Sequence, residues 1–99
     1  MESEYQQLRN KIDKFKAQIK EDLKARFLYA LSLYRDGRGQ DAEDWAIALA
    51  EYFSEPEGKG QWETTVSDAS IASRADPFSF KDLKDKLENI LDVLRKFMH

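Results

Sequence analysis

The sequence predicts an all-α fold, a small helical bundle of three main helices with a possible short fourth helix. Two stretches of regularly spaced apolar residues support this prediction. The first, called the front stripe below, consists of Tyr5, Leu8, Ile12, Phe15 and Ile19. The second lies near the end of the chain and consists of Leu83, Leu87, Ile90, Leu94 and Phe97. Steps of three and four residues place such side chains on one face of a helix, which then packs against another element.

The length and the composition indicate how the chain is organised. It has 99 residues and no cysteine, so we expect one domain, residues 1–99, that needs neither disulfides nor cysteine-bound metal. A chain of this size buries roughly 65% of its unfolded surface, which is enough for it to fold alone. The sequence has no signal-peptide-like segment and no apolar run of about 18 residues. We therefore expect a cytoplasmic protein that does not enter a membrane.

The first helix is expected to span residues 4–36, because no proline or glycine lies between these positions. Its apolar positions recur every ~3.7 residues on average, which fits a straight helix better than the 3.5-residue repeat of a left-handed coiled coil. Such a helix is ~50 Å long, and a second helix of ~20 Å can cover only its back half. We expect the C-terminal helix to cover the front stripe, within one chain or across a homodimer. A stripe that neither covers would bind a partner protein.

The second helix is expected over residues 41–54. Gly37 and Gly39 end the first helix, since glycine readily adopts the left-handed conformation that often follows a helix C-terminus. Asp41 is a good N-cap for the helix that follows. The first helix and this one would form an αα-hairpin. The predicted core face of the second helix carries Trp45, Ala46, Leu49, Tyr52 and Phe53.

Residues 55–78 are predicted as a loop, with a possible short helix over residues 67–74. A compact domain rarely contains a loop of ~20 residues unless that loop is functional or mobile. Trp62 lies in this polar, glycine-flanked stretch. Tryptophan is common at binding hot spots, so Trp62 is a candidate partner-binding residue. The alternative is that its ring folds back as a lid over the helices.

The last helix is expected over residues 79–98. Ser79 is a good N-cap, and Asp82 three residues later completes the pattern of a helix start. Phe78, just before the cap, is placed to pack against Leu83.

Charge is unevenly distributed along a chain whose formal net charge is −3. Between Arg9 and Arg26 there are seven basic and three acidic residues, whereas between Asp36 and Glu57 there are one basic and seven acidic residues. The simplest interpretation is that the basic helix lies beside the acidic one. The alternative is a basic stripe that binds an acidic partner. Binding to nucleic acid is disfavoured, because the basic residues spread round the helix and no known nucleic-acid-binding motif is present.

The candidate catalytic residues are few. His99, the single histidine, is the last residue, which is a poor position for a general base or a metal ligand. Asp41 and Asp44 lie one turn apart, as do Asp82, Asp85 and Glu88, and such carboxylates could hold Mg²⁺. However, the first pair occupies capping positions, and the second group alternates with lysines as on a solvated, ion-paired face. We therefore expect neither catalysis nor a cofactor or metal.

The sequence thus favours a non-catalytic protein-interaction module, such as an adaptor, an inhibitor or a small subunit of an assembly. Its partner would be another protein or a second copy of the chain. A small all-α Mg²⁺-dependent nucleotide hydrolase and a nucleic-acid accessory protein that uses the basic first helix are the alternatives. The residues predicted to form the partner-binding or dimer surface are Tyr5, Leu8, Ile12, Phe15, Ile19 and Trp62.

Overall fold

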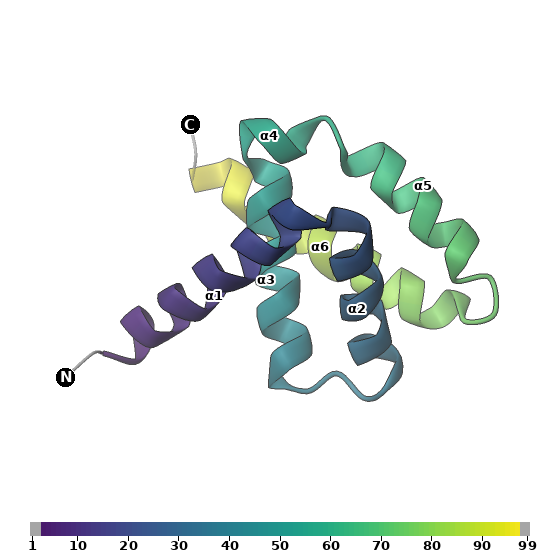
Figure 1. Ribbon diagram of the computed structural model, residues 1–99, viewed down its shortest axis with the longest axis horizontal. Helices are drawn as coiled ribbons and strands as arrows, with labels where there is room; N and C mark the ends of the chain where they lie inside the picture. The colour runs from purple at the N-terminus through teal and green to yellow at the C-terminus, as the bar shows by residue number, and fades with distance from the viewer. Residues whose placement is uncertain (1–2, 98–99) are drawn as a thin grey trace.

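The computed structural model describes residues 3–97, and within this range the chain forms six α-helices and no strand (Figure 1). In chain order these are α1 (Glu4–Glu21), α2 (Leu23–Arg35), α3 (Gln40–Ser54), α4 (Pro56–Lys59), α5 (Trp62–Ala72) and α6 (Pro77–Phe97). The predicted all-α fold is confirmed. The predicted number of helices is too low, because the first predicted helix is broken and the predicted loop is helical.

The prediction of one unbroken helix over residues 4–36 is wrong, because the chain leaves the helical conformation at Asp22. This residue has φ −156° and ψ 84°, and its carboxylate accepts a hydrogen bond of 3.1 Å from the backbone N–H of Ala25. Aspartate is one of the best N-cap residues, so Asp22 can start α2 without the help of proline or glycine. As a result, α1 and α2 point in clearly different directions (Figure 1).

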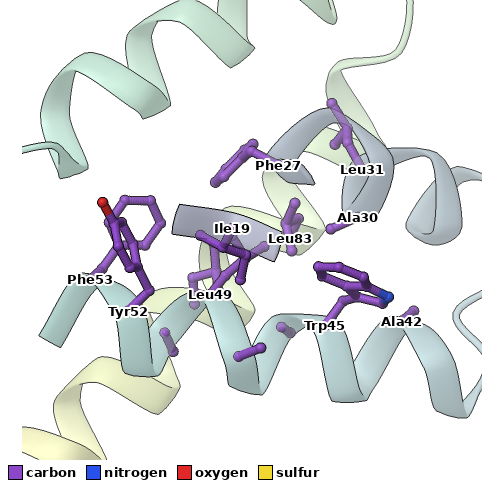
Figure 2. Packing of buried hydrophobic residues seen from close by; sticks show 14 of the residues in the cluster. Ile19, Phe27, Ala30, Leu31, Ala42, Trp45, Leu49, Tyr52, Phe53 and Leu83 are labelled. Atoms are coloured by element: carbon purple, nitrogen blue, oxygen red, sulfur yellow. The ribbon is translucent and has the colours of Figure 1, made fainter. Parts of the chain in front are cut away.

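Helix α3 is the centre of the core. It packs against α1, α2, α4 and α6, and its alanines let the neighbouring backbones come close. Figure 2 shows Ile19, Phe27 and Leu83 converging from three other helices on the side of α3 that carries Leu49 and Trp45. The predicted core face of α3 is confirmed, since all five of its residues are buried. The remaining core residues are Ile12, Ala30, Leu31, Tyr34, Ala42, Ala48, Ala50, Ala69, Leu87 and Leu91.

The expectation that the C-terminal helix covers the front stripe is wrong within one chain. Helix α6 packs mainly against α3 and α2, and the inner face of α1 lies on α3. The break at Asp22 explains the difference, because it turns α1 back across α3 and removes the need for a second long helix beside it.

Two boundaries also differ from the expected ones. Helix α3 begins at Gln40 with Gly39 as its N-cap, so Asp41 lies in the first turn and is not the cap. Helix α6 begins at Pro77, and proline suits the first helical position because its missing N–H is not needed there. The Asp76 carboxylate accepts bonds from the backbone N–H and the hydroxyl of Ser79, at 3.2 and 2.6 Å. The predicted end at residue 98 lies outside the described residues.

Residues 55–78 are more ordered than predicted. Helix α4 follows α3 after a single residue, and α5 begins at Trp62, five residues before the possible helix predicted at 67–74. Gly58 allows this tight return, because a Cβ atom there would overlap the carbonyl oxygen of Tyr52 and lie 2.8 Å from its carbonyl carbon. Helix α5 therefore starts close to the end of α3, with Trp62 at its first position.

Candidate functional site

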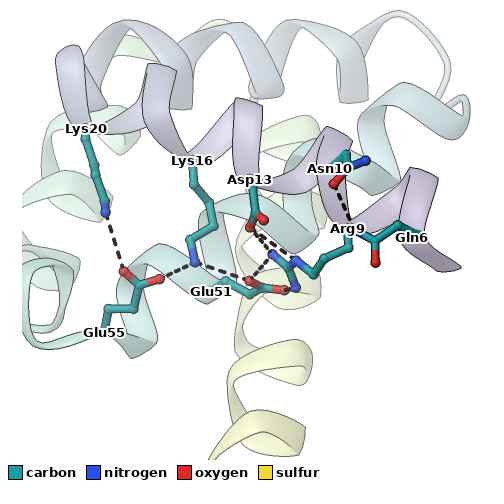
Figure 3. Close-up of polar contacts among 8 residues, drawn as sticks. All are labelled: Gln6, Arg9, Asn10, Asp13, Lys16, Lys20, Glu51 and Glu55. Atoms are coloured by element: carbon teal, nitrogen blue, oxygen red, sulfur yellow. Dashed lines mark hydrogen bonds and ion pairs between the residues drawn. The ribbon is translucent and has the colours of Figure 1, made fainter. Parts of the chain in front are cut away.

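The acidic α3 lies beside the basic α1, as the charge pattern predicts. Figure 3 shows Arg9 and Lys16 reaching from α1 to Glu51 on α3. The Arg9 guanidinium binds both carboxylate oxygens of Glu51, at 2.7 and 2.9 Å. Lys16 lies between Glu51 and Glu55, with the Glu51 carboxylate at 3.3 Å. Bidentate pairing of this kind fixes orientation as well as charge, so these contacts hold α1 across α3.

A second group of charges joins the same two helices. The Lys11 ammonium lies 2.7 Å from Asp44 and 3.2 Å from Asp41. Asp44 is buried, and pairing with Lys11 and a hydrogen bond of 2.9 Å from Gln40 satisfy its carboxylate. Asp41 and Asp44, the first pair considered as Mg²⁺ ligands, therefore have a structural role between α1 and α3.

The front stripe is divided by the fold. Ile12 and Ile19 are 1% and 0% exposed, and the Phe15 ring stacks on Trp45 with centroids 4.1 Å apart. These three side chains pack within the chain. Tyr5 and Leu8 are 73% and 40% exposed, on the end of α1 that projects from the body of the molecule in Figure 1. Of the predicted partner-binding residues on α1, Tyr5 and Leu8 are thus the ones that are exposed.

Trp62 lies at the centre of a different surface. Its half-buried ring packs edge-on against Phe53, with centroids 5.0 Å apart. The ring also lines an open groove of about 530 Å³ between α5 and α6. The residues of this α5–α6 groove are Trp62, Glu63, Val66, Ser67, Ser70, Ile71, Phe80 and Lys84. Trp62 therefore combines the lid and binding-site interpretations, because one part of the ring seals the core and another part faces the groove.

The α5–α6 groove continues along α6 into a more polar hollow. This hollow measures about 270 Å³ and shares Trp62 and Lys84 with the groove. Lys84 pairs with Glu88 at 3.1 Å, and Arg95 approaches Asp92 at 3.8 Å. Its lining residues are Trp62, Lys84, Glu88, Leu91, Asp92 and Arg95. One end of the combined surface is therefore apolar and the other carries both signs of charge.

Helix α5 has few buried side chains. Only Thr65 and Ala69 of this helix are buried, and both are small. Both line a cavity between α5 and α2, and α5 contacts α2 and α6. The sequence analysis missed Val66, Ile71 and Phe80. If residues 62–72 had been treated as one helix, Val66 would have been placed one turn from Trp62 on the same face.

A smaller cavity of about 260 Å³ lies between α2 and the other side of α5. Its apolar lining comes from Leu23, Phe27, Leu28 and Ala69, and Thr65 adds a hydroxyl. Small-molecule pockets usually measure ~300–1,000 Å³, so this cavity is below the usual size for a cofactor.

Two of the other carboxylates considered as Mg²⁺ ligands are engaged with lysines. Lys81 binds Asp85 at 2.6 Å, and Glu88 pairs with Lys84 as described. Within residues 3–97, no group of three or more His, Cys, Asp or Glu side chains is arranged to hold a metal ion. His99 lies outside the described residues. No helix in the described part of the chain is both long and apolar enough to span a membrane.

Comparisons with protein-family models, curated proteins and solved structures found no match to this chain.

Proposed function

We propose that this chain is a non-catalytic protein-interaction module, an adaptor, inhibitor or small assembly subunit, that binds an amphipathic helix of its partner in the α5–α6 groove. The observation that carries the proposal is the open, apolar groove lined by Trp62, Val66, Ile71 and Phe80. Contiguous apolar surface that is open to water often marks a protein-interaction site. Ile71 is 56% exposed, so more than half of this side chain is in contact with water.

The dimensions of the surface suit a helix. From Phe80 to Arg95, α6 rises ~22 Å, which matches about 15 residues of a partner helix. Helices that bind in grooves present apolar anchors at positions i, i+3 or i+4, and i+7. We expect such anchors to pack around Trp62, and polar or charged side chains of both signs to follow toward Glu88 and Arg95.

Trp62 is the expected anchor of the interaction. A tryptophan ring offers a large contact area and a single N–H donor, and it loses little conformational freedom on binding. Because Phe53 holds one side of the ring, Trp62 is already oriented before a partner arrives. Preorganisation of this kind lowers the entropy lost on association.

Site-specific photo-crosslinking in the cells that produce the protein tests the proposal. A photoreactive amino acid at Val66 lies in the groove, whereas the same group at Lys14 lies on the exposed face of α1. We expect a discrete crosslinked partner from position 66 and not from position 14. The crosslinked peptide of the partner, identified by mass spectrometry, should be an amphipathic helix.

A matched pair of variants distinguishes specific binding in the groove from nonspecific binding to exposed apolar residues. Ile71 and Val93 are exposed aliphatic residues on helices, 56% and 51% exposed, but only Ile71 lines the groove. Ile71→Asp should abolish the crosslink from position 66, and Val93→Asp should leave it intact. Equal crosslinking in both variants would contradict the proposal.

The two alternatives from the sequence have their own test. Isothermal titration with Mg²⁺ should show no binding that depends on Asp85, because Asp85 is paired with Lys81 on an exposed face. A tight Mg²⁺ site that is lost in Asp85→Asn would favour the nucleotide-hydrolase alternative. Salt-sensitive binding of an RNA or DNA duplex that is lost when Lys14 and Lys24 are replaced would favour the nucleic-acid alternative.

A further inference from the structure

The junction between α1 and α2 is a break of one residue in an otherwise continuous helix. The Asp22 N–H donates to the Gln18 carbonyl at 3.2 Å, and the Arg26 N–H donates to the Asp22 carbonyl at 3.1 Å. The helical hydrogen-bond pattern therefore runs up to Asp22 and resumes four residues later. Of the intervening N–H groups, that of Ala25 is bound by the Asp22 carboxylate. Within residues 3–97, the backbone N–H groups of Leu23 and Lys24 donate to no backbone carbonyl in the preceding turn.

The apolar pattern continues across the junction without a change of spacing. Ile19 on α1 is followed at steps of four residues by Leu23 and Phe27 on α2. In a straight helix these side chains would lie on one face together with Ile12 and Phe15. The segment also contains no proline or glycine. A continuous helix over residues 4–35 is therefore compatible with the local sequence, and it would complete the missing backbone hydrogen bonds.

Straightening the junction would lift α1 off α3. It would uncover Ile12 and Ile19, separate Phe15 from Trp45, and leave Glu51 without Arg9 and Lys16. A lone chain would therefore expose a large apolar surface and unpaired charges. The uncovered face of α3 has one well-matched occupant, which is another copy of α1. The same residues of a second chain would restore every contact that the first chain had lost.

We propose that this chain forms a dimer by exchanging α1, with α1 and α2 of each copy joined as one helix and with each α1 packed on α3 of the other copy. The closed form gains the Asp22 cap, and the exchanged form gains the continuous backbone hydrogen bonds. Packing between α1 and α3 is the same in both, which is the usual energetic basis of exchange between identical subunits. The groove is built by α5 and α6, whereas α1 packs mainly on α3 and α2. An exchanged dimer would thus carry two grooves, and this last consequence rests on the proposed function.

The exchange predicts opposite effects for two neighbouring substitutions. Asp22→Ala removes the cap that favours the closed form. Loss of an N-cap costs ~1 kcal/mol, or about fivefold per chain, so two chains should dimerise about 25-fold more tightly. Leu23→Pro should prevent the dimer, because proline is tolerated at the first position of α2 but not inside a continuous helix. Asp22→Ser, which keeps a cap, and Leu23→Ala, which removes the same side chain, are the matched controls.

Light scattering after size-exclusion chromatography measures these effects, on proteins refolded at low and at high concentration. We expect Asp22→Ala to form dimers at concentrations where Asp22→Ser and the wild type are monomeric. We expect Leu23→Pro to stay monomeric where Leu23→Ala still dimerises. Circular dichroism checks that each variant is folded. An Asp22→Ala protein that stays folded and monomeric at all concentrations would overturn the proposal, as would a dimer that survives Leu23→Pro.

A crosslinking experiment on the otherwise wild-type chain tests the exchange directly. Lys16 on α1 contacts Glu55, the C-cap residue of α3, and the chain has no native cysteine. The double variant Lys16→Cys, Glu55→Cys is treated with a short bifunctional maleimide after refolding at low or high concentration. Closed monomers give an internal crosslink, whereas exchanged dimers give a covalent dimer on a denaturing gel. If dimers form but their crosslinks remain internal, α1 has not been exchanged and the proposal is wrong.

Discussion

The ring of Phe15 lies flat against the indole of Trp45, with centroids 4.1 Å apart and planes inclined by 8°. Tyr29 meets the same indole edge-on at 5.5 Å, and the Arg26 guanidinium lies 5.9 Å from its centre. Side chains from α1 and α2 thus converge on one residue of α3. This convergence fixes how the two halves of the broken helix are placed relative to α3.

We expect Trp45→Ala to lower the free energy of unfolding by about 3–5 kcal/mol, as for other buried aromatic residues. Phe15→Ala should also destabilise the protein. The double variant should lose less than the sum of the two by about 0.5–1.5 kcal/mol, since each single change already removes the stacked pair. Urea unfolding monitored by circular dichroism measures all three values. Strict additivity would show that the stacked geometry adds nothing beyond burial.

Trp62→Ala is the comparison for Trp45→Ala. Because Trp62 is half-buried and partly faces the α5–α6 groove, its removal should cost clearly less than that of Trp45. The same variant should weaken partner capture if the groove binds a helix. Equal, large losses of stability at both positions would make Trp62 a core residue and weaken the case for the groove.

Gly58→Ala should destabilise the protein by about 2 kcal/mol or more, because a forced overlap with rigid atoms must be relieved by moving the backbone. The obstacle is the carbonyl group of Tyr52, at the end of α3. Gly60→Ala, two residues later, is the matched control, since a Cβ atom there meets no other atom within 4 Å. Thermal unfolding of the two variants gives the comparison. Similar melting temperatures would show that α4 does not lie as close to α3 as the structure has it.

The stability of the protein should fall as the pH is lowered through the titration of Glu51. Burial by itself would raise the pKa of this carboxyl, but hydrogen bonds and charges from Arg9 and Lys16 outweigh it and leave the pKa below its usual value of 4.5. A carboxyl with a lowered pKa in the folded state contributes its full stabilisation above its unfolded pKa and loses it as the pH falls. Glu51→Gln should therefore be less stable than the wild type at pH ~7, and the difference should shrink toward pH ~3.

Urea unfolding at a series of pH values measures this effect. Glu63→Gln, on the exposed face of α5, is the control, because the structure gives Glu63 no ion pair within residues 3–97. That variant should match the wild type at neutral pH. A Glu51→Gln difference that is the same at every pH would contradict the assigned role of the Arg9–Glu51 pair.

Tyr34→Phe should leave the stability within about 0.5 kcal/mol of the wild type or raise it, because removing an unsatisfied buried hydroxyl carries no lost hydrogen bond. The Tyr34 hydroxyl is buried without a hydrogen-bond partner within the described residues. Burial also raises the pKa of Tyr34 from 10.0 to about 12. Because the pKa of Tyr34 is higher in the folded state, its titration does not change the free energy of unfolding below its unfolded pKa of 10.0. Above that value the free energy of unfolding falls as the pH rises toward about 12.

Unfolding at alkaline pH checks the second part of this prediction. The wild type should lose stability between pH ~10 and pH ~12 more steeply than Tyr34→Phe does. Tyr29→Phe is a suitable control, because Tyr29 is 44% exposed. A marked loss of stability in Tyr34→Phe at neutral pH would show that the hydroxyl has a partner after all.

The groove was predictable only in part. Trp62 could be singled out because an isolated tryptophan in a polar stretch is unusual. Val66, Ile71 and Phe80 could not, since they belong to two helices, α5 and α6, whose relative placement is set by contacts between residues distant in the sequence. A groove is a property of the space between helices, and the spacing of residues along one helix does not describe that space.

By itself the sequence determined the helical class, the core face of α3 and the pairing of basic α1 with acidic α3. These features follow from residue spacing and from blocks of charge, which act over one or two turns or through complementary signs. Only the tertiary structure decided that the chain bends at Asp22 and that α3 covers Ile12 and Ile19. At Asp22 the local sequence is compatible with a continuing helix, since no proline or glycine lies nearby, and also with a new N-cap, since aspartate is a good capping residue. The packing of α1 on α3, which involves residues distant in the sequence, selects the bend.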